Sequence, residues 1–211
     1  MCWSFEVSVL TGLISYSIAL YIWLRNIKND RWHAIILLTF SSIQWMDAVL
    51  WKSKQSSKLS LLTITYFIPF ILALEPVSSL YGAYYTNKNI DKSDMILYLF
   101  VFLFLFISLS KGAQKTGFIT SEGIRYSIYQ SSFSYWVYAF LLLYPFIKYS
   151  TENTFNIITI IVVCFGLFIA QITSPNTVGS HWCLYGNIAA IFFLFYPYID
   201  NYFNPNNFNE I

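Results

Sequence analysis

Long apolar runs, separated by short stretches in which charged and polar residues gather, follow one another along this chain. A helix needs about 20 mainly apolar residues to cross the roughly 30 Å hydrocarbon core of a bilayer. Seven runs meet or approach that length, at residues 6–24, 32–51, 60–86, 95–110, 132–149, 155–174 and 181–199. The pattern therefore predicts an all-α integral membrane protein, a polytopic bundle of seven transmembrane helices.

Each run is expected to be helical because lipid offers no partner for an unpaired backbone amide or carbonyl. The alternating pattern of a membrane barrel is missing from the runs. The fourth run is short and has room to extend past one of its flanking charges, Asp94 or Lys111. The first has no basic flank before it and is expected to be a retained helix, not a cleaved signal. Residues 1–200 should form one transmembrane domain, followed by a polar, loose tail at 201–211.

Composition supports this class. The 211 residues are 57% hydrophobic and only 10% charged, against about 25% charged in soluble domains. Twelve Lys and Arg against ten Asp and Glu leave a net charge of +2 and no basic stripe, which argues against nucleic-acid binding. The expected partners are the lipid bilayer and a small ligand, ion or lipid, and an oligomer is compatible with the sequence. No cofactor is predicted.

The basic residues bear on orientation. Arg25, Lys28 and Arg31 follow the first predicted helix and none precedes it, which favours an N-terminus outside or in the lumen and a cytoplasmic C-terminus. Summed over all connections, however, Lys and Arg are equally numerous on the two sides.

With seven crossings, the N-terminus, the end of the second helix and the start of the seventh lie on one side of the membrane. A set of residues that we call the polar pole cluster is therefore expected on that side: Cys2, Ser4, Glu6, Trp51, His181, Trp182 and Cys183. Cys2 and Cys183 could form a disulfide if that side is oxidising, or simply pack. Together with His181 and Asp47 they are suitable zinc ligands, but paired ligand spacings are missing, so a metal site stays open.

The second helix carries polar residues on one face. Gln44, Asp47 and Trp51 follow i, i+3, i+7 spacing, and Ser41 falls on nearly the same stripe. An ionised Asp at the membrane centre costs about 2.5–3.5 kcal/mol on insertion scales. Asp47 is either an interfacial carboxyl hydrogen-bonded to a neighbouring helix or part of a ligand, proton or cation site.

Glu75 lies near the middle of the third run and is followed by Pro76. Pro76 and Pro69 each remove a backbone donor, which leaves carbonyls near residues 65 and 72 in need of other partners. A carboxyl beside a broken helix at mid-depth is common in ion and substrate sites of transporters. Either Glu75 is a protonated acid hydrogen-bonded across the bundle, or it handles protons or cations.

Two further candidates for a ligand or ion pathway are Gln171, late in the sixth run, and Asn187, near the start of the seventh. Such groups often hydrogen-bond one helix to another. The longest connection, residues 111–132, mixes glycines with apolar residues. It reads as a lid or interfacial segment, or as a loop packed on the bundle.

The opening MCWSFEVS, the stretch LRNIKNDRWHAIILLTFSSIQWMDAVLW and the stretch SHWCLYGNIAAIFF resemble a family of uncharacterised multi-span membrane proteins from bacteria, protists and large DNA viruses. That family opens with Met-Cys-Phe/Trp-Ser, ends its first helix with Leu-Arg, carries Gln-x-x-Glu and a later Trp in its second helix, and begins its last with Trp-Cys. The matching residues here are Leu24–Arg25, Gln44 with Asp47 and Trp51, and Trp182–Cys183. Asp47 replaces the usual Glu. The resemblance covers the first fifty residues and the last helix, omits Glu75, and implies no activity.

Three functions are compatible with these features. The first is a channel or carrier for protons, cations or a small solute, with Glu75 and Asp47 on its path. The second is a receptor-like or structural protein that binds a ligand, lipid or partner. The third, an intramembrane enzyme, is least favoured, because His33 and His181 lie at opposite ends and a zinc bound by three histidines is excluded.

Overall fold

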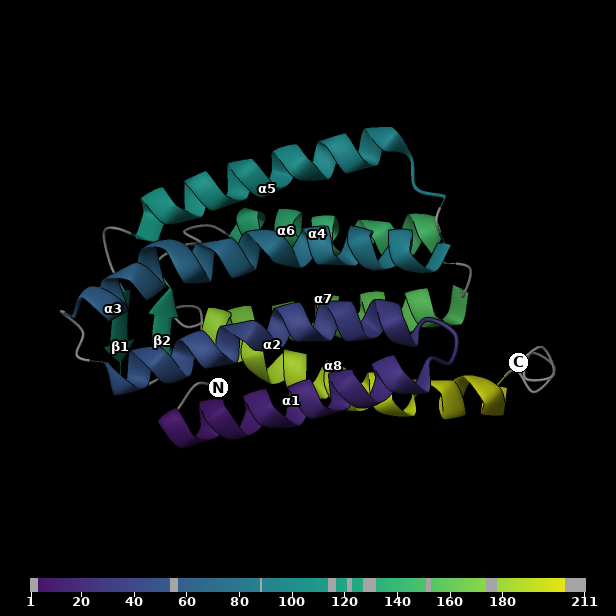
Figure 1. Ribbon diagram of the computed structural model, residues 1–211, viewed down its shortest axis with the longest axis horizontal. Coiled ribbons are helices and arrows are strands. Elements are labelled where there is room, and N and C mark those ends of the chain that lie inside the picture. Colours follow the sequence, from purple (N-terminus) through teal and green to yellow (C-terminus); the bar gives the residue numbers. More distant parts are fainter. Residues whose placement is uncertain are drawn as a thin grey trace.

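The computed structural model describes residues 4–53, 57–87, 89–113, 117–120, 123–126, 132–150, 153–173 and 178–203. Its long helices lie side by side along one axis (Figure 1). In chain order the elements are α1 (Phe5–Arg25), α2 (Asp30–Lys52), α3 (Lys58–Leu62), the π-helix η1 (Thr63–Phe67), α4 (Ile68–Asn87), α5 (Lys92–Ala113), β1 (Gly117–Thr120), β2 (Gly123–Tyr126), α6 (Ser132–Tyr149), α7 (Asn153–Thr173) and α8 (Val178–Phe203). Every predicted run is a helix, and the all-α class is confirmed.

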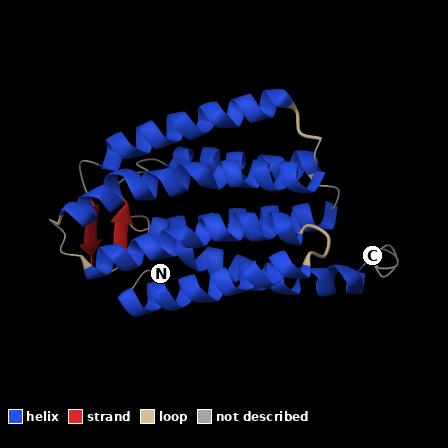
Figure 2. Ribbon diagram, in the orientation of Figure 1, coloured by secondary structure: helices blue, strands red, loops and turns tan. Residues whose placement is uncertain are grey.

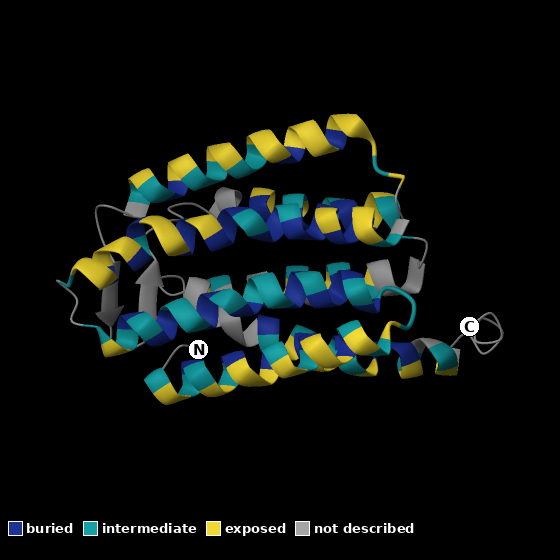
Figure 3. Ribbon diagram, viewed as in Figure 1, coloured by how far each residue is buried: buried dark blue, intermediate teal, exposed yellow. Residues whose placement is uncertain are grey.

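Among the described residues, four helical segments are long and apolar enough to cross a membrane: Phe5–Arg25, Asp30–Lys52, Lys58–Thr86 and Lys92–Gly112. The third of these segments consists of α3, η1 and α4, which follow one another without a break. α5 extends past both Asp94 and Lys111, further than the sequence predicted. Most of its surface is exposed (Figure 3), including Phe100 at 65% and Phe104 at 70%. An outer face of this kind suits contact with acyl chains.

The connection between α5 and α6 contains a short antiparallel hairpin (Figure 2), in which Ile119 pairs with Ile124. Its second strand contacts α8. The hairpin, the beginning of α1 and the end of α2 lie at the same end of the bundle, and the C-terminal end of α8 lies at the other. This strand pair was not predicted. Of the two interpretations of residues 111–132, the described contacts fit a connection packed on the bundle.

Prolines inside the helices create hydrogen bonds between helices. A proline has no N–H for the carbonyl four residues earlier, and its ring also crowds that turn. Pro145 lies inside α6, so the Leu141 carbonyl loses its helical donor. That carbonyl accepts a hydrogen bond from the Tyr98 hydroxyl of α5 at 2.5 Å, and the next one, at Leu142, accepts from the Ser79 hydroxyl of α4 at 2.9 Å. The proline in α6 therefore frees the acceptor through which α5 is bonded to α6.

Replacing Tyr98 with phenylalanine tests this attachment. Tyr98 is buried, and its loss as a donor leaves the Leu141 carbonyl without its side-chain partner, so we expect a destabilisation of about 0.5–2 kcal/mol. Tyr66→Phe, at an exposed tyrosine of η1, is the matched control and should change stability little. The free energy of unfolding in detergent micelles is the measurement, and equal values for the two variants would contradict the expectation.

Candidate functional site

The polar face of α2 points into the bundle, as its spacing predicted. Ser41, Gln44 and Asp47 are all buried, with Asp47 at 0% exposure. Within the described part of the chain, the Ser41 hydroxyl and the Gln44 carbonyl oxygen have no hydrogen-bond partner. Buried polar groups are usually paired, so this stretch of α2 retains unused hydrogen-bonding capacity in the interior.

Glu75 is buried at 0% exposure in α4. Its carboxyl oxygen Oε2 lies 2.5 Å from the hydroxyl oxygen of Tyr138 in α6. The same hydroxyl lies 2.8 Å from the carbonyl oxygen of Leu72, which is the carbonyl that Pro76 deprives of its helical donor. Tyr138 thus joins a buried acid to an acceptor that the proline created. The sequence predicted that a carbonyl near residue 72 would need another partner, and this contact provides it.

Glu75, Tyr138 and the Leu72 carbonyl form what we call the Glu75 triad, and the number of available hydrogens allows it two protonation states. A tyrosine hydroxyl has one hydrogen, and the Leu72 carbonyl can only accept. If Tyr138 donates to Leu72, the short contact to Glu75 needs the hydrogen of a protonated carboxyl. If Glu75 is ionised, Tyr138 donates to it in a short, charge-assisted bond, and the Leu72 carbonyl loses its donor. The protonation of Glu75 is therefore coupled to a hydrogen bond that supports the proline turn of α4.

The π-helix η1 lies one turn before Pro69. There the Ile68 amide donates to the Thr63 carbonyl, five residues back, and the wider turn precedes the missing N–H of Pro69. π-helical turns are rare and occur often at functional sites. Within η1, the Thr65 hydroxyl is buried and lacks a partner among the described residues. The third segment is thus irregular at both of its prolines.

A pocket lies between α2, α6, α7 and α8. Its cavity measures about 60 Å³ and is open on one side. Its walls are apolar and include Leu37 and Phe40 of α2, Leu142 of α6, and Gly186 of α8; Thr159 of α7 adds a hydroxyl. Gln44 follows Phe40 by one turn of α2, and Tyr138 precedes Leu142 by one turn of α6. The apolar pocket therefore lies beside the polar interior that contains the Glu75 triad.

The polar pole cluster is only partly described. The Ser4 hydroxyl accepts a hydrogen bond from the Val7 amide and caps α1, and Glu6 is exposed in the first turn of α1. Trp51 packs against an apolar cluster of α2, α4 and α5. These contacts are structural. Cys2 and the side chains of His181, Trp182 and Cys183 lie outside the described residues, so the proposed disulfide and zinc site stay predictions.

The two remaining pathway candidates also lie in α7 and α8. Asn187 accepts a hydrogen bond at 2.8 Å from the hydroxyl of Ser15, which joins α8 to α1. The Gln171 amide nitrogen is buried and has no partner among the described residues. Helix joining of this kind is one of the two roles that the sequence suggested for small polar groups. The described side chains include no group of three His, Cys, Asp or Glu able to hold a metal.

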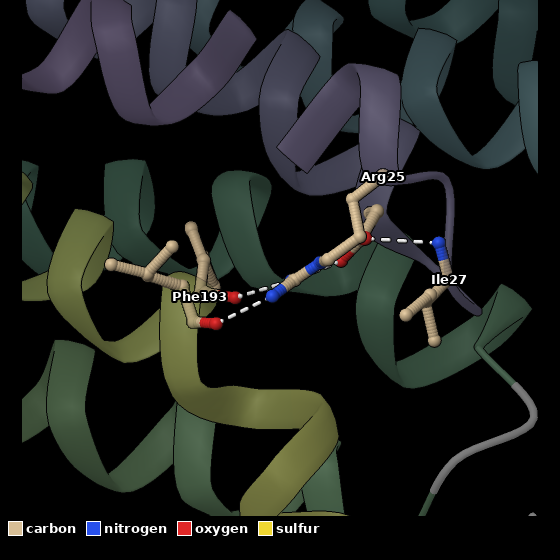
Figure 4. A network of polar contacts seen from close by, with 5 residues as sticks. Arg25, Ile27 and Phe193 are labelled. Atoms are coloured by element: carbon tan, nitrogen blue, oxygen red, sulfur yellow. Dashed lines mark hydrogen bonds and ion pairs between the residues drawn. The ribbon is translucent and has the colours of Figure 1, made fainter. Parts of the chain in front are cut away.

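Arg25 forms a buried network that sequence reasoning missed (Figure 4). Its guanidinium makes two bonds to Asp30, at 2.7 and 2.8 Å, and the two side chains are 8% and 1% exposed. Two other bonds reach α8, to the carbonyls of Phe193 at 3.2 Å and Leu194 at 2.6 Å. Pro197, inside α8, removes the helical donor of the Phe193 carbonyl. A proline four residues after an acceptor was the available signal.

Other side chains complete this end of the bundle, opposite the hairpin. His33 is buried and stacks on Phe193 with ring centroids 4.4 Å apart. Lys148 of α6 forms ion pairs with Asp91 at 2.7 Å and with Asp94 at 3.0 Å, and the Tyr149 hydroxyl donates to Asp94 at 2.6 Å. These contacts fasten α6 to the start of α5.

Comparisons with protein-family models, with curated proteins and with solved structures each find no match for this chain. The family resemblance described above therefore stays a prediction, and functional inference depends on the geometry of the interior.

Proposed function

We propose that this protein is a seven-span membrane bundle that carries protons across the bilayer, alone or with a small solute, and that Glu75 is its proton-binding residue. The observation that carries the proposal is the Glu75–Tyr138–Leu72 triad. It combines a fully buried carboxyl, a hydroxyl partner on another helix and a carbonyl freed by Pro76. Intramembrane acids of this kind commonly bind and release protons in carriers.

Together with the four segments already described, the lengths of the last three helices support the proposal of seven crossings. α6, α7 and α8 have 18, 21 and 26 residues, or about 27, 31 and 39 Å at 1.5 Å per residue. Each is close to or above the roughly 30 Å of a hydrocarbon core. The proposal includes an N-terminus outside or in the lumen and a cytoplasmic C-terminus, and membership of the multi-span family that the sequence resembles.

The proline turn explains how binding a proton could lead to movement. When Glu75 gives up its proton, the Tyr138 hydrogen turns to the carboxylate and the Leu72 carbonyl loses its donor. The turn of α4 before Pro76 is then held by fewer bonds. A change at one oxygen thus alters the bending of a helix that packs against α2, α5 and α6, which is the kind of small bias that shifts a two-state bundle.

Proton flux into vesicles tests the proposal. Purified protein is reconstituted with a pH-sensitive dye inside, and a potassium gradient with valinomycin drives proton entry. We expect wild-type protein to exceed protein-free vesicles and Glu75→Gln to fall to their level. Tyr138→Phe should also be slower, since the carboxyl loses its partner. Glu6→Gln, which changes an exposed acid of α1, is the matched control and should conduct normally.

An infrared measurement separates proton binding from transport. At neutral pH the wild-type protein should show the carbonyl stretch of a protonated carboxyl in the membrane interior, and Glu75→Gln should lack it. Flux unaffected by Glu75→Gln, or wild-type flux equal to that of empty vesicles, would contradict the proposed function. A missing infrared band would contradict the protonated state of the triad.

A further inference from the structure

We propose that the pocket between α2, α6, α7 and α8 binds an acyl chain, and that the Thr159 hydroxyl donates a hydrogen bond to an oxygen at the end of that chain. The bound molecule is a membrane lipid or a free fatty acid, which share this chemistry. This site is distinct from the Glu75 triad and does not depend on proton transport.

Its walls favour an apolar occupant. Leucine, isoleucine, valine and phenylalanine side chains dominate the lining, and apolar cavities in proteins stay dry instead of filling with water. The cavity measures about 60 Å³, several times the roughly 10–15 Å³ that a single water needs, so it has room for a few methylene groups of an acyl chain. Because the bundle lies in a bilayer, acyl chains are the apolar molecules at highest concentration around it.

Thr159 supplies the polar contact. Its side chain is buried at 7% exposure, and its hydroxyl has no hydrogen-bond partner among the described residues. In the described helices, the hydroxyls of Thr11, Thr39, Thr63 and Thr86 donate to the carbonyl four residues earlier, whereas that of Thr65 in η1 makes no such bond. Thr159 lines the pocket without making that bond. A hydroxyl left unused in an apolar wall fits a ligand that has one acceptor oxygen.

Gly186 keeps the pocket open. A Cβ atom placed on Gly186 would meet nothing within 4 Å, although the residue is buried and lines the pocket. Glycine in a helix costs about 1 kcal/mol relative to alanine. A larger side chain at this position would therefore occupy space that is empty in the protein, and a leucine there should fill the pocket without disturbing the fold.

Photolabelling tests the site. Purified protein is incubated with a fatty acid that carries a diazirine in its chain, or in a parallel arm with a phospholipid that carries it in one acyl chain. We expect saturable labelling of peptides from α6 and α8. Gly186→Leu should weaken binding about tenfold, since two methylenes excluded from the pocket suffice for that loss. Thr159→Val should weaken it roughly two- to tenfold.

Three controls make the result decisive. Gly112→Leu adds the same bulk to a helical glycine of α5 that also has open space around it, and should label as the wild type does. Glu75→Gln should also label normally, which separates this site from the proposed proton site. Thermal unfolding shows that each variant is folded. Labelling in one arm only identifies the lipid or the fatty acid as ligand. Non-saturable labelling, or equal labelling of the two leucine variants, would overturn the proposal.

Discussion

Replacing Arg25 with methionine is expected to destabilise the protein by about 3–5 kcal/mol, the usual cost of breaking a buried ion pair by removing one partner. Methionine keeps much of the apolar stem but none of the donors. Asp30 would stay buried at 1% exposure without its cation, and the carbonyls of Phe193 and Leu194 would lose their guanidinium donor. The connection from α1 to α2 and the proline turn of α8 would therefore loosen together.

The unfolding free energy in detergent micelles, from denaturant titration, measures this effect. Arg31→Met is the matched control: Arg31 lies over the rings of Trp23 and Tyr85, and loss of such a contact costs about 0.5–2 kcal/mol. The double variant with Arg25→Met and Asp30→Asn should be more stable than Arg25→Met alone, because the uncompensated charge is gone. Arg25→Met no more destabilised than Arg31→Met would show that the network does not stabilise the fold.

The helices were predictable from the sequence because their signal is local. A run of apolar residues must be helical in lipid whatever surrounds it, so all seven runs are recognisable, and 132–149 coincides with Ser132–Tyr149. The ends were less certain where charges occur. α5 continues past Asp94, because Lys148 and Tyr149 bind that carboxylate, and these partners come from α6. Sequence pattern alone does not identify such partners.

The interior chemistry was predictable only in part, for the same reason. The prolines identified which carbonyls would lack donors, but not the helix that supplies a replacement. Tyr138 reaches Leu72 from 66 residues away, and Arg25 reaches Leu194 from 169 residues away. Tyr138 was an aromatic in an apolar run, and Arg25 served to assign orientation and as part of the Leu24–Arg25 match, with no partner predicted for either. The sequence signal for such contacts is an interior proline together with a side-chain donor on another helix.

The pocket could not be predicted at all. Its lining residues have the same composition as residues that face lipid, so no pattern distinguishes an inner apolar surface from an outer one. For the polar pole cluster, the sequence predicted a shared location but could not predict contacts. Counting crossings predicts which residues share an end of the bundle but not which of them are in contact, and Ser4 and Glu6 belong to the cap and first turn of α1 instead.

Replacing Gly82 with alanine is expected to destabilise the protein by about 3 kcal/mol or more, at or above the upper end of the range for overpacked cores. A Cβ atom at this position would lie 2.2 Å from Cδ1 of Trp32. The indole cannot move aside easily, because Trp32 is fully buried and stacks on Phe146 with ring centroids 4.7 Å apart. Either α4 must separate from α2 or the stacked pair must break.

The other glycines of the bundle provide a graded series for this prediction. Gly186→Ala, with open space, should be neutral or stabilising by up to about 1 kcal/mol, and Gly12→Ala, where the nearest Trp45 atom is 3.2 Å away, should fall between the two. Shortening the indole in a Gly82→Ala, Trp32→Leu double variant removes the clash, so its destabilisation should be well below the sum of the single changes. Unfolding free energies that rank Gly82→Ala with Gly186→Ala would mean that α2 and α4 do not approach as closely as this contact requires.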